Sequence, residues 1–208
     1  MIDMFNCDHA SALEAADKTI AYCTEQAYLF WLYAGTIVRG WAIANLGDPA
    51  KGVAILEQGL SGWEMIGSII VRPIFLGLLG EAQALCDDLE NALASVEQGL
   101  NIARIHGELI AELYLQRIQG MLLKKHGRER ESETTLRNTI ERSLQSGARS
   151  HALFAAVELA ESQKHSGSGF DGKETVKRIL TSYQEGFDTP LVKRAQEIAG
   201  VSAISIDN

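Results

Sequence analysis

The sequence predicts an all-α solenoid, in which antiparallel helix pairs stack along the chain. Three observations support this fold class. The chain of 208 residues contains 3 Pro and 19 Gly, so long helices are permitted while many positions are unusually small. Apolar residues recur at helical spacing, as in Leu89, Leu93, Val96 and Leu100. The segment AILEQGL at 54–60 also returns as ASVEQGL forty residues later, and a fixed period of this size indicates a repeat protein.

The 40-residue period holds at several independent positions. One set of equivalent positions is small in every unit, with Gly40, Gly80, Gly120 and Ala160. Another set is apolar in every unit, with Leu56, Val96, Leu136 and Val176. Agreement at several positions across four units predicts about four structural repeats.

Each unit is predicted to contain two helices joined by a Gly-containing turn. The units span about 25–67, 68–107, 108–147 and 148–186. The first helices are expected at 25–46, 68–86, 108–126 and 148–165, and the second helices at 49–66, 88–106, 128–146 and 172–185. A capping helix at 8–24 opens the stack, and a terminal capping helix at 189–199 follows Gly186 with Pro190 in its first turn. The whole chain, 1–208, is therefore predicted to be a single repeat domain.

Glycine within helices needs a cause, because Gly costs about 1 kcal/mol relative to Ala in a helix interior. Gly40 in the first helix of a unit is followed twelve residues later by Gly52 in the second helix, and the other units also carry small residues at these positions. We expect the small residues to let the two helices of a unit approach closely.

The composition excludes several classes of protein. A formal net charge of −8 argues against nucleic-acid binding, which requires clustered Lys and Arg. The 3 Cys are widely spaced and form no CxxC pair, which favours reduced thiols in a cytoplasmic protein, and we expect no signal peptide. The apolar segments 27–47 and 65–80 offer a membrane-spanning alternative, but each contains an arginine near its middle, where a charge is costly in lipid.

The spacing of small residues resembles the tetratricopeptide repeat. That repeat has small residues at its eighth, twentieth and twenty-seventh positions and a large apolar residue at its twenty-fourth. In the first unit these positions hold Gly40, Gly52, Gly59 and Leu56. The resemblance implies a right-handed superhelical solenoid of antiparallel helix pairs. The period of 40 residues differs from the usual 34, so the curvature is expected to differ.

The segments 147–163, 179–198 and 72–100 are similar to the C-terminal repeat region of large bacterial signalling proteins. In those proteins the region follows an adenylate or guanylate cyclase domain, or a DNA-binding regulator, and a predicted AAA-type ATPase. No GxxxxGK[ST] phosphate loop occurs in this sequence, so the resemblance implies a regulatory repeat region and no ATPase or cyclase activity.

Residues for catalysis or metal binding are not grouped in the sequence. The five His residues are scattered without an HExxH motif, and Cys86 with His126 supplies only two ligands where zinc needs three or four. We therefore predict no catalytic residue, no metal and no cofactor.

The concave groove of the solenoid is the predicted binding surface. The tetratricopeptide mapping implies that the first helices line it, and six candidate binding residues lie there: Trp41, Glu81, Tyr114, Arg117, Met121 and Lys124. This mixture of apolar and charged side chains suits a partner helix or an extended peptide.

The sequence thus predicts a non-catalytic interaction or scaffold module of a bacterial signalling system, binding a protein or peptide partner, with neither nucleic acid nor membrane. A homo-oligomer stays open. One alternative is a small-molecule sensor with a cavity near Trp31, Trp41 and Trp63, and a second alternative is a small enzyme.

Overall fold

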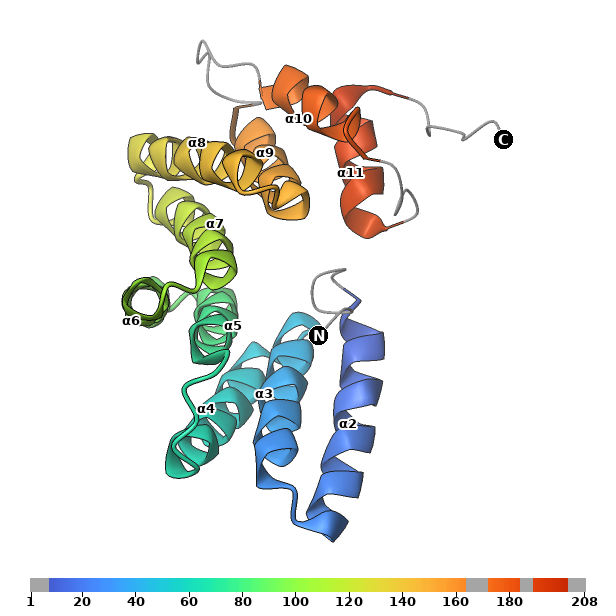
Figure 1. The fold of residues 1–208 in the computed structure, drawn as a ribbon, viewed down its shortest axis with the longest axis vertical. Helices are drawn as coiled ribbons and strands as arrows, with labels where there is room; N and C mark the ends of the chain where they lie inside the picture. Colours follow the sequence, from blue (N-terminus) through green and yellow to red (C-terminus); the bar gives the residue numbers. More distant parts are fainter. Residues whose placement is uncertain (1–7, 164–171, 184–188, 202–208) are drawn as a thin grey trace, which may run out of the picture. The chain divides into compact units, whose positions relative to one another are not determined.

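The computed structural model describes residues 8–163, 172–183 and 189–201, and within these ranges it contains ten α-helices and no strand (Figure 1). Helices adjacent in sequence pack as neighbours, which confirms the predicted all-α fold of stacked helix pairs. The helices are α2 (His9–Gln26), α3 (Leu29–Asn45), α4 (Pro49–Met65), α5 (Arg72–Leu85), α6 (Leu89–His106), α7 (Leu109–Lys125), α8 (Glu129–Gln145), α9 (Arg149–Gln163), α10 (Gly172–Leu180) and α11 (Pro190–Ala199).

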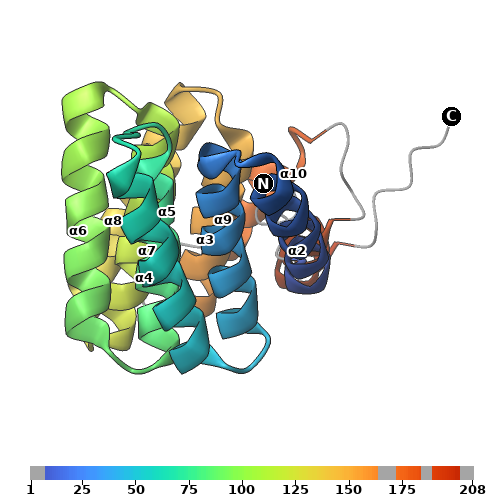
Figure 2. The ribbon, with the colours of Figure 1, turned by 90° about the horizontal axis from the view of Figure 1, so that it is seen from below.

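The chain divides into two compact units, residues 1–118 and 119–208, called unit 1 and unit 2. In unit 1, α3 packs against α2, α4 and α5, and α5 packs against α4 and α6. In unit 2, α9 packs against α8, α10 and α11, and α10 packs against α11. Consecutive helices run antiparallel, so the turns of unit 1 alternate between two ends (Figure 2).

The second helices of the first three repeats bury the same positions. Over 51–60, 91–100 and 131–140, the second, sixth, ninth and tenth residues are buried and the other six are exposed or partly exposed. The buried apolar anchors include Leu56, Val96 and Leu136, each 1% exposed or less. The 40-residue period of the sequence is therefore also the period of the packing.

Close helix contact explains the small residues inside helices. A Cβ atom on Gly40 would lie 2.7 Å from both the Gly52 carbonyl oxygen and the Leu56 backbone nitrogen, so α3 and α4 touch through their backbones. In unit 2, the equivalent of Gly52 is Ser132, whose buried hydroxyl donates a hydrogen bond of 2.7 Å to the Gly120 carbonyl. A small side chain is thus required at both positions of the pair.

Most helix ends fall close to the predicted ends, and three differ by four or five residues. Helix α3 begins at Leu29 rather than 25, because α2 continues to Gln26 and Ala27 then takes a left-handed backbone conformation with φ of 55°. Helix α5 begins at Arg72 rather than 68, because Val71 adopts a left-handed backbone conformation with φ of 53° and Pro73 occupies the first turn. Helix α10 ends at Leu180 rather than 185. The hydroxyls of Thr181 and Ser182 each donate a 2.7 Å hydrogen bond to a carbonyl of the last turn, which satisfies acceptors there without a further turn.

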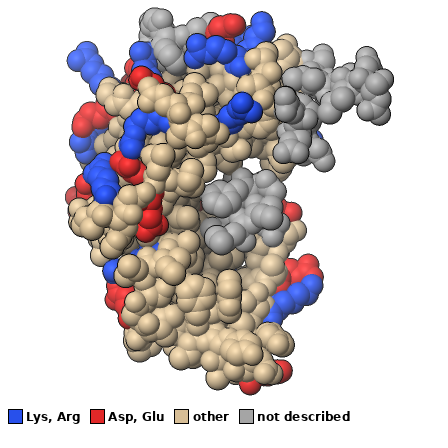
Figure 3. Space-filling model, in the orientation of Figure 1, with Lys and Arg blue, Asp and Glu red and all other residues tan. Residues whose placement is uncertain are grey.

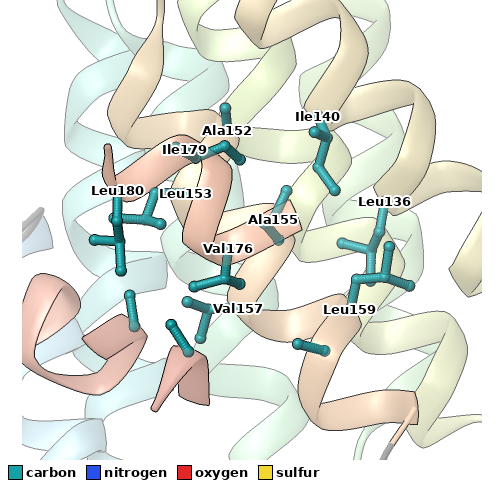
Figure 4. Packing of buried hydrophobic residues seen from close by; sticks show 14 of the residues in the cluster. Leu136, Ile140, Ala152, Leu153, Ala155, Val157, Leu159, Val176, Ile179 and Leu180 are labelled. Carbon is teal, nitrogen blue, oxygen red and sulfur yellow. The ribbon is translucent and has the colours of Figure 1, made fainter. Parts of the chain in front are cut away.

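The core of unit 2 is formed by side chains of α8, α9, α10 and α11. Leu136 and Ile140 from α8 meet Leu153 and Leu159 from α9, and Val176 completes the cluster from α10 (Figure 4). Interlocking apolar side chains of this kind provide most of the free energy of folding.

Helix α11 closes unit 2, as expected for a terminal cap. Its buried face is formed by Val192, Ala195 and Ala199, and the partly buried Leu191 and Ile198 pack beside it. The Thr189 hydroxyl accepts a hydrogen bond from the Val192 backbone N–H and caps the helix. The predicted stop at Gly186 lies outside the described residues.

Segment 27–47 contains α3, and segment 65–80 runs from the last residue of α4 into α5. Within the described ranges, no helix combines the length and the apolar character needed to cross a membrane.

Candidate functional site

A polar cluster in unit 1 is centred on Glu81 of α5. The Trp41 indole N–H of α3 donates a 2.9 Å hydrogen bond to Glu81 Oε2, and Arg117 Nη2 of α7 lies 2.8 Å from Glu81 Oε1. The Tyr114 hydroxyl of α7 lies 3.5 Å from Glu81 Oε2, a long hydrogen bond. One carboxylate therefore links the first helices of three consecutive repeats.

Two aromatic rings flank this cluster. The Arg117 guanidinium lies 5.5 Å from the centroid of the Tyr114 ring, within the range of a cation–π contact. The His9 ring of α2 lies 4.7 Å from the Trp41 ring. The Glu81 and Arg117 side chains are only 18% and 12% exposed, so their attraction is screened less than that of a surface ion pair.

Four of the six predicted binding residues, Trp41, Glu81, Tyr114 and Arg117, thus lie together. Trp41 and Tyr114 are buried, at 3% and 8% exposure, so little of either side chain is open to a partner. The other two, Met121 and Lys124, follow on α7 within unit 2, where Met121 is partly buried and Lys124 is exposed.

His9 is a cluster member that the sequence did not single out. Burial lowers its pKa below the ordinary value of 6.5, and the nearby carboxylates of Glu81 and Asp8 oppose that shift. The only sequence signal was its place at the start of the capping helix, which must cover the first repeat.

The same type of ion pair recurs in unit 2. Glu161 lies at the repeat position of Glu81, two periods later, and its Oε1 accepts a 2.7 Å hydrogen bond from Arg194 Nε of α11. In both units, a glutamate on one helix pairs with an arginine two helices later in the chain, from α5 to α7 in unit 1 and from α9 to α11 in unit 2.

The three tryptophans do not share one cavity. Trp63 is fully buried in the core, where its ring is tilted against Phe30 and meets Phe75 edge to face, whereas Trp31 is 57% exposed. A pocket of about 400 Å³ lies elsewhere, between α2, α3 and α4. The lining combines apolar and polar side chains: Asp17, Ile20, Leu32, Tyr33, Thr36, Arg39, Ile55 and Gln58.

An ion pair and a close ring contact involve residues that line the pocket. Arg39 Nε donates a 2.7 Å hydrogen bond to Asp17 Oδ1 across the α2–α3 boundary. The Tyr33 ring lies directly on Gly62, where any Cβ atom would overlap it. The volume falls within the range of small-molecule sites.

In the part of the chain that the structure describes, no group of three His, Cys, Asp or Glu side chains is placed to hold a metal ion. Cys23 is buried and Cys86 is exposed, and both are free thiols.

Comparison with known proteins identifies the fold alone. No protein-family model and no curated protein matches the chain. The crystal structure of BtubC (BKLC) from P. vanneervenii is similar, with a TM-score of 0.68 over 92% of this chain and 84% of that chain. The sequence identity is 13%, so this similarity supports the helical architecture and carries no function with it.

Proposed function

We propose that the protein is a non-catalytic interaction module, whose first-helix face in unit 1 binds a helix or peptide of a partner protein. The observation that carries the proposal is the linkage of α3, α5 and α7 through Glu81, Trp41 and Arg117. The linkage holds neighbouring first helices in register, so that residues from three repeats form one preorganised surface. Preorganisation lowers the entropic cost of binding.

The chemistry of this face suits protein recognition. Trp41, Tyr114 and Arg117 are largely buried, so they hold the face rigid, and a partner would contact the exposed side chains around them, such as Leu85 of α5. The resemblance of the sequence to the repeat region of bacterial cyclase–ATPase signalling proteins favours a regulatory partner in the cytoplasm.

Site-directed photocrosslinking in the native cell tests the proposal. A photoreactive residue at Ala34 of α3 or at the exposed Leu85 of α5 would report on the first-helix face, and one at the exposed Glu57 or Gln98 would report on the second helices. We expect one partner to be captured from the first-helix positions and not from the second-helix positions. Equal capture from both sets, or none from the first set, would contradict the proposal.

A small-molecule sensor is the second candidate, favoured by the pocket between α2, α3 and α4. A metabolite that fits it is expected to raise the melting temperature of the wild-type chain and not that of Ile55→Trp, in which the larger ring fills the space. If no compound of a broad panel shifts the melting temperature, this candidate is wrong.

A further inference from the structure

The turns that lead from one repeat to the next carry exposed apolar side chains at equivalent positions. Leu29, Ile69 and Leu109 begin or precede three successive first helices, and all three are exposed. Polar residues normally occupy such turns, because apolar side chains gain nothing there from folding.

Two more repeat positions carry exposed apolar side chains at two of these three turns. Met65 and Ile105, near the ends of α4 and α6, are 76% and 69% exposed, and Ile70 and Ile110 are also exposed. The seven exposed side chains at these turns are called the apolar edge: Leu29, Met65, Ile69, Ile70, Ile105, Leu109 and Ile110. Because consecutive helices are antiparallel, the α2–α3, α4–α5 and α6–α7 turns all lie at one end of unit 1 (Figure 2).

The fourth repeat provides an internal control. At its equivalent positions the chain has Gln145, Arg149 and Ser150, and these residues are exposed as well. The fold therefore accepts polar side chains at these positions, and the apolar edge is no requirement of packing. Exposed apolar patches of this kind mark interaction sites.

The charge of unit 1 indicates the chemistry of the partner. Residues 1–118 contain 15 Asp and Glu but 6 Lys and Arg, a formal charge of −9, whereas residues 119–208 contain 12 acidic and 13 basic residues. Arg72 and Arg104, the two arginines near the apolar edge, are engaged in ion pairs with Glu64 and with Glu112. The surface over α3 and α4 shows few charged groups on the face drawn in Figure 3.

The negative charge of unit 1 favours some candidate partners of the apolar edge over others. An anionic lipid surface would repel unit 1, and a second copy of the chain would bring two acidic units together. A positively charged partner gains from the same field.

We propose that the apolar edge docks an amphipathic, Lys/Arg-bearing helix of a partner protein. Neighbouring first helices pack about 8–10 Å apart, so three turns span roughly 20 Å. A helix rises about 1.5 Å per residue, so roughly four turns of a partner helix cover this span, with apolar residues seven apart in register with successive repeats. This edge is distinct from the first-helix face and stands independently of the function proposed above.

The test uses the 208-residue chain and two synthetic helices of roughly 18 residues with the same leucine face, one carrying Lys and the other Glu. We expect the Leu–Lys peptide to bind at least ten times more tightly than the Leu–Glu peptide, with an affinity that falls as salt rises. Ile69→Gln combined with Leu109→Gln should weaken that binding at least tenfold with unchanged helicity. The matched control, Leu46→Gln, removes an exposed leucine from the opposite end and should bind as wild type does.

Four outcomes would overturn the proposal. The first two are equal affinity of the chain for both peptides and an equal loss of peptide affinity in the Leu46→Gln control. The third is that the wild type binds phosphatidylserine-containing vesicles and the edge variant does not. The fourth is that the wild type sediments as a dimer and the edge variant as a monomer. The last two would assign the edge to a membrane or to a second copy. None depends on the first-helix face.

Discussion

Trp41 and Glu81 occupy the same position in consecutive repeats, and the indole N–H of Trp41 donates a 2.9 Å hydrogen bond to the carboxylate of Glu81. A repeat protein is held together by the interfaces between neighbouring repeats. In unit 1 one such interface carries a polar contact between equivalent positions, and Arg117 extends it to the next first helix. The cluster is therefore expected to contribute to stability as well as to the binding face.

Glu81→Ala is expected to lower the free energy of unfolding by about 2–3 kcal/mol, because it leaves the Arg117 guanidinium and the Trp41 N–H without their acceptor in a shielded site. Glu81→Gln keeps an acceptor and should lose less. Urea unfolding measures both. The exposed Glu57→Ala is the control and should change stability by less than about 0.5 kcal/mol. An Ala variant as stable as this control would show that the cluster contributes nothing.

Gly40→Ala is expected to destabilise the chain by roughly 3 kcal/mol or to prevent folding. The new Cβ atom would lie 2.7 Å from two backbone atoms of α4, and backbone atoms cannot rotate away as a side chain can. Thermal unfolding monitored by circular dichroism measures the change. A melting temperature equal to that of the wild type would refute the close packing of α3 on α4.

Gly127→Ala is expected to cost about 1 kcal/mol for a different reason. No atom lies within 4 Å of the position of a Cβ there, but the backbone φ is +78°, which residues with a side chain rarely adopt. Gly127→Asn should cost less, since Asn tolerates the left-handed conformation better. Chemical denaturation of the two variants checks the order. If the Gly127→Ala and Gly127→Asn variants are equally stable, the left-handed backbone conformation is not the cause of the loss.

The stability of unit 1 is expected to fall as the pH drops below about 6.5. Burial lowers the pKa of His9 in the folded state, so below the unfolded value of 6.5 the unfolded chain binds more protons than the folded chain. The loss ends once the pH is below the folded-state pKa. Melting temperatures between pH 7.5 and about 5 measure the effect. His9→Phe keeps a ring beside Trp41 without the proton, and a pH dependence as steep as that of the wild type would exclude His9 as its source.

Much of the fold was predictable because the repeat places each residue in an environment seen several times. The pattern around Leu56, Val96 and Leu136 predicted helix faces that are buried in the structure. The ends of α5 and α10 were not predictable, because Val71 takes a backbone conformation unusual for its type and Thr181 and Ser182 act through local hydrogen bonds.

The candidate site was predictable in part. The repeat register placed Trp41, Glu81, Tyr114 and Arg117 on the first helices, whose side chains were expected to share one face. Their joint contact with one carboxylate, and the covering of Trp41 by His9, depend on distances between helices that no spacing in the sequence expresses.

The sequence by itself determined the architecture of this protein, because a 40-residue period combined with apolar residues at helical spacing predicts repeated packing of helix pairs. The tertiary structure decided which polar side chains are paired and which apolar ones stay exposed. Leu109 at the start of α7 and Leu113 one turn later are the same residue type, yet Leu109 is exposed and Leu113 is fully buried. Burial depends on neighbours from distant parts of the chain, and only the packed structure brings those neighbours together.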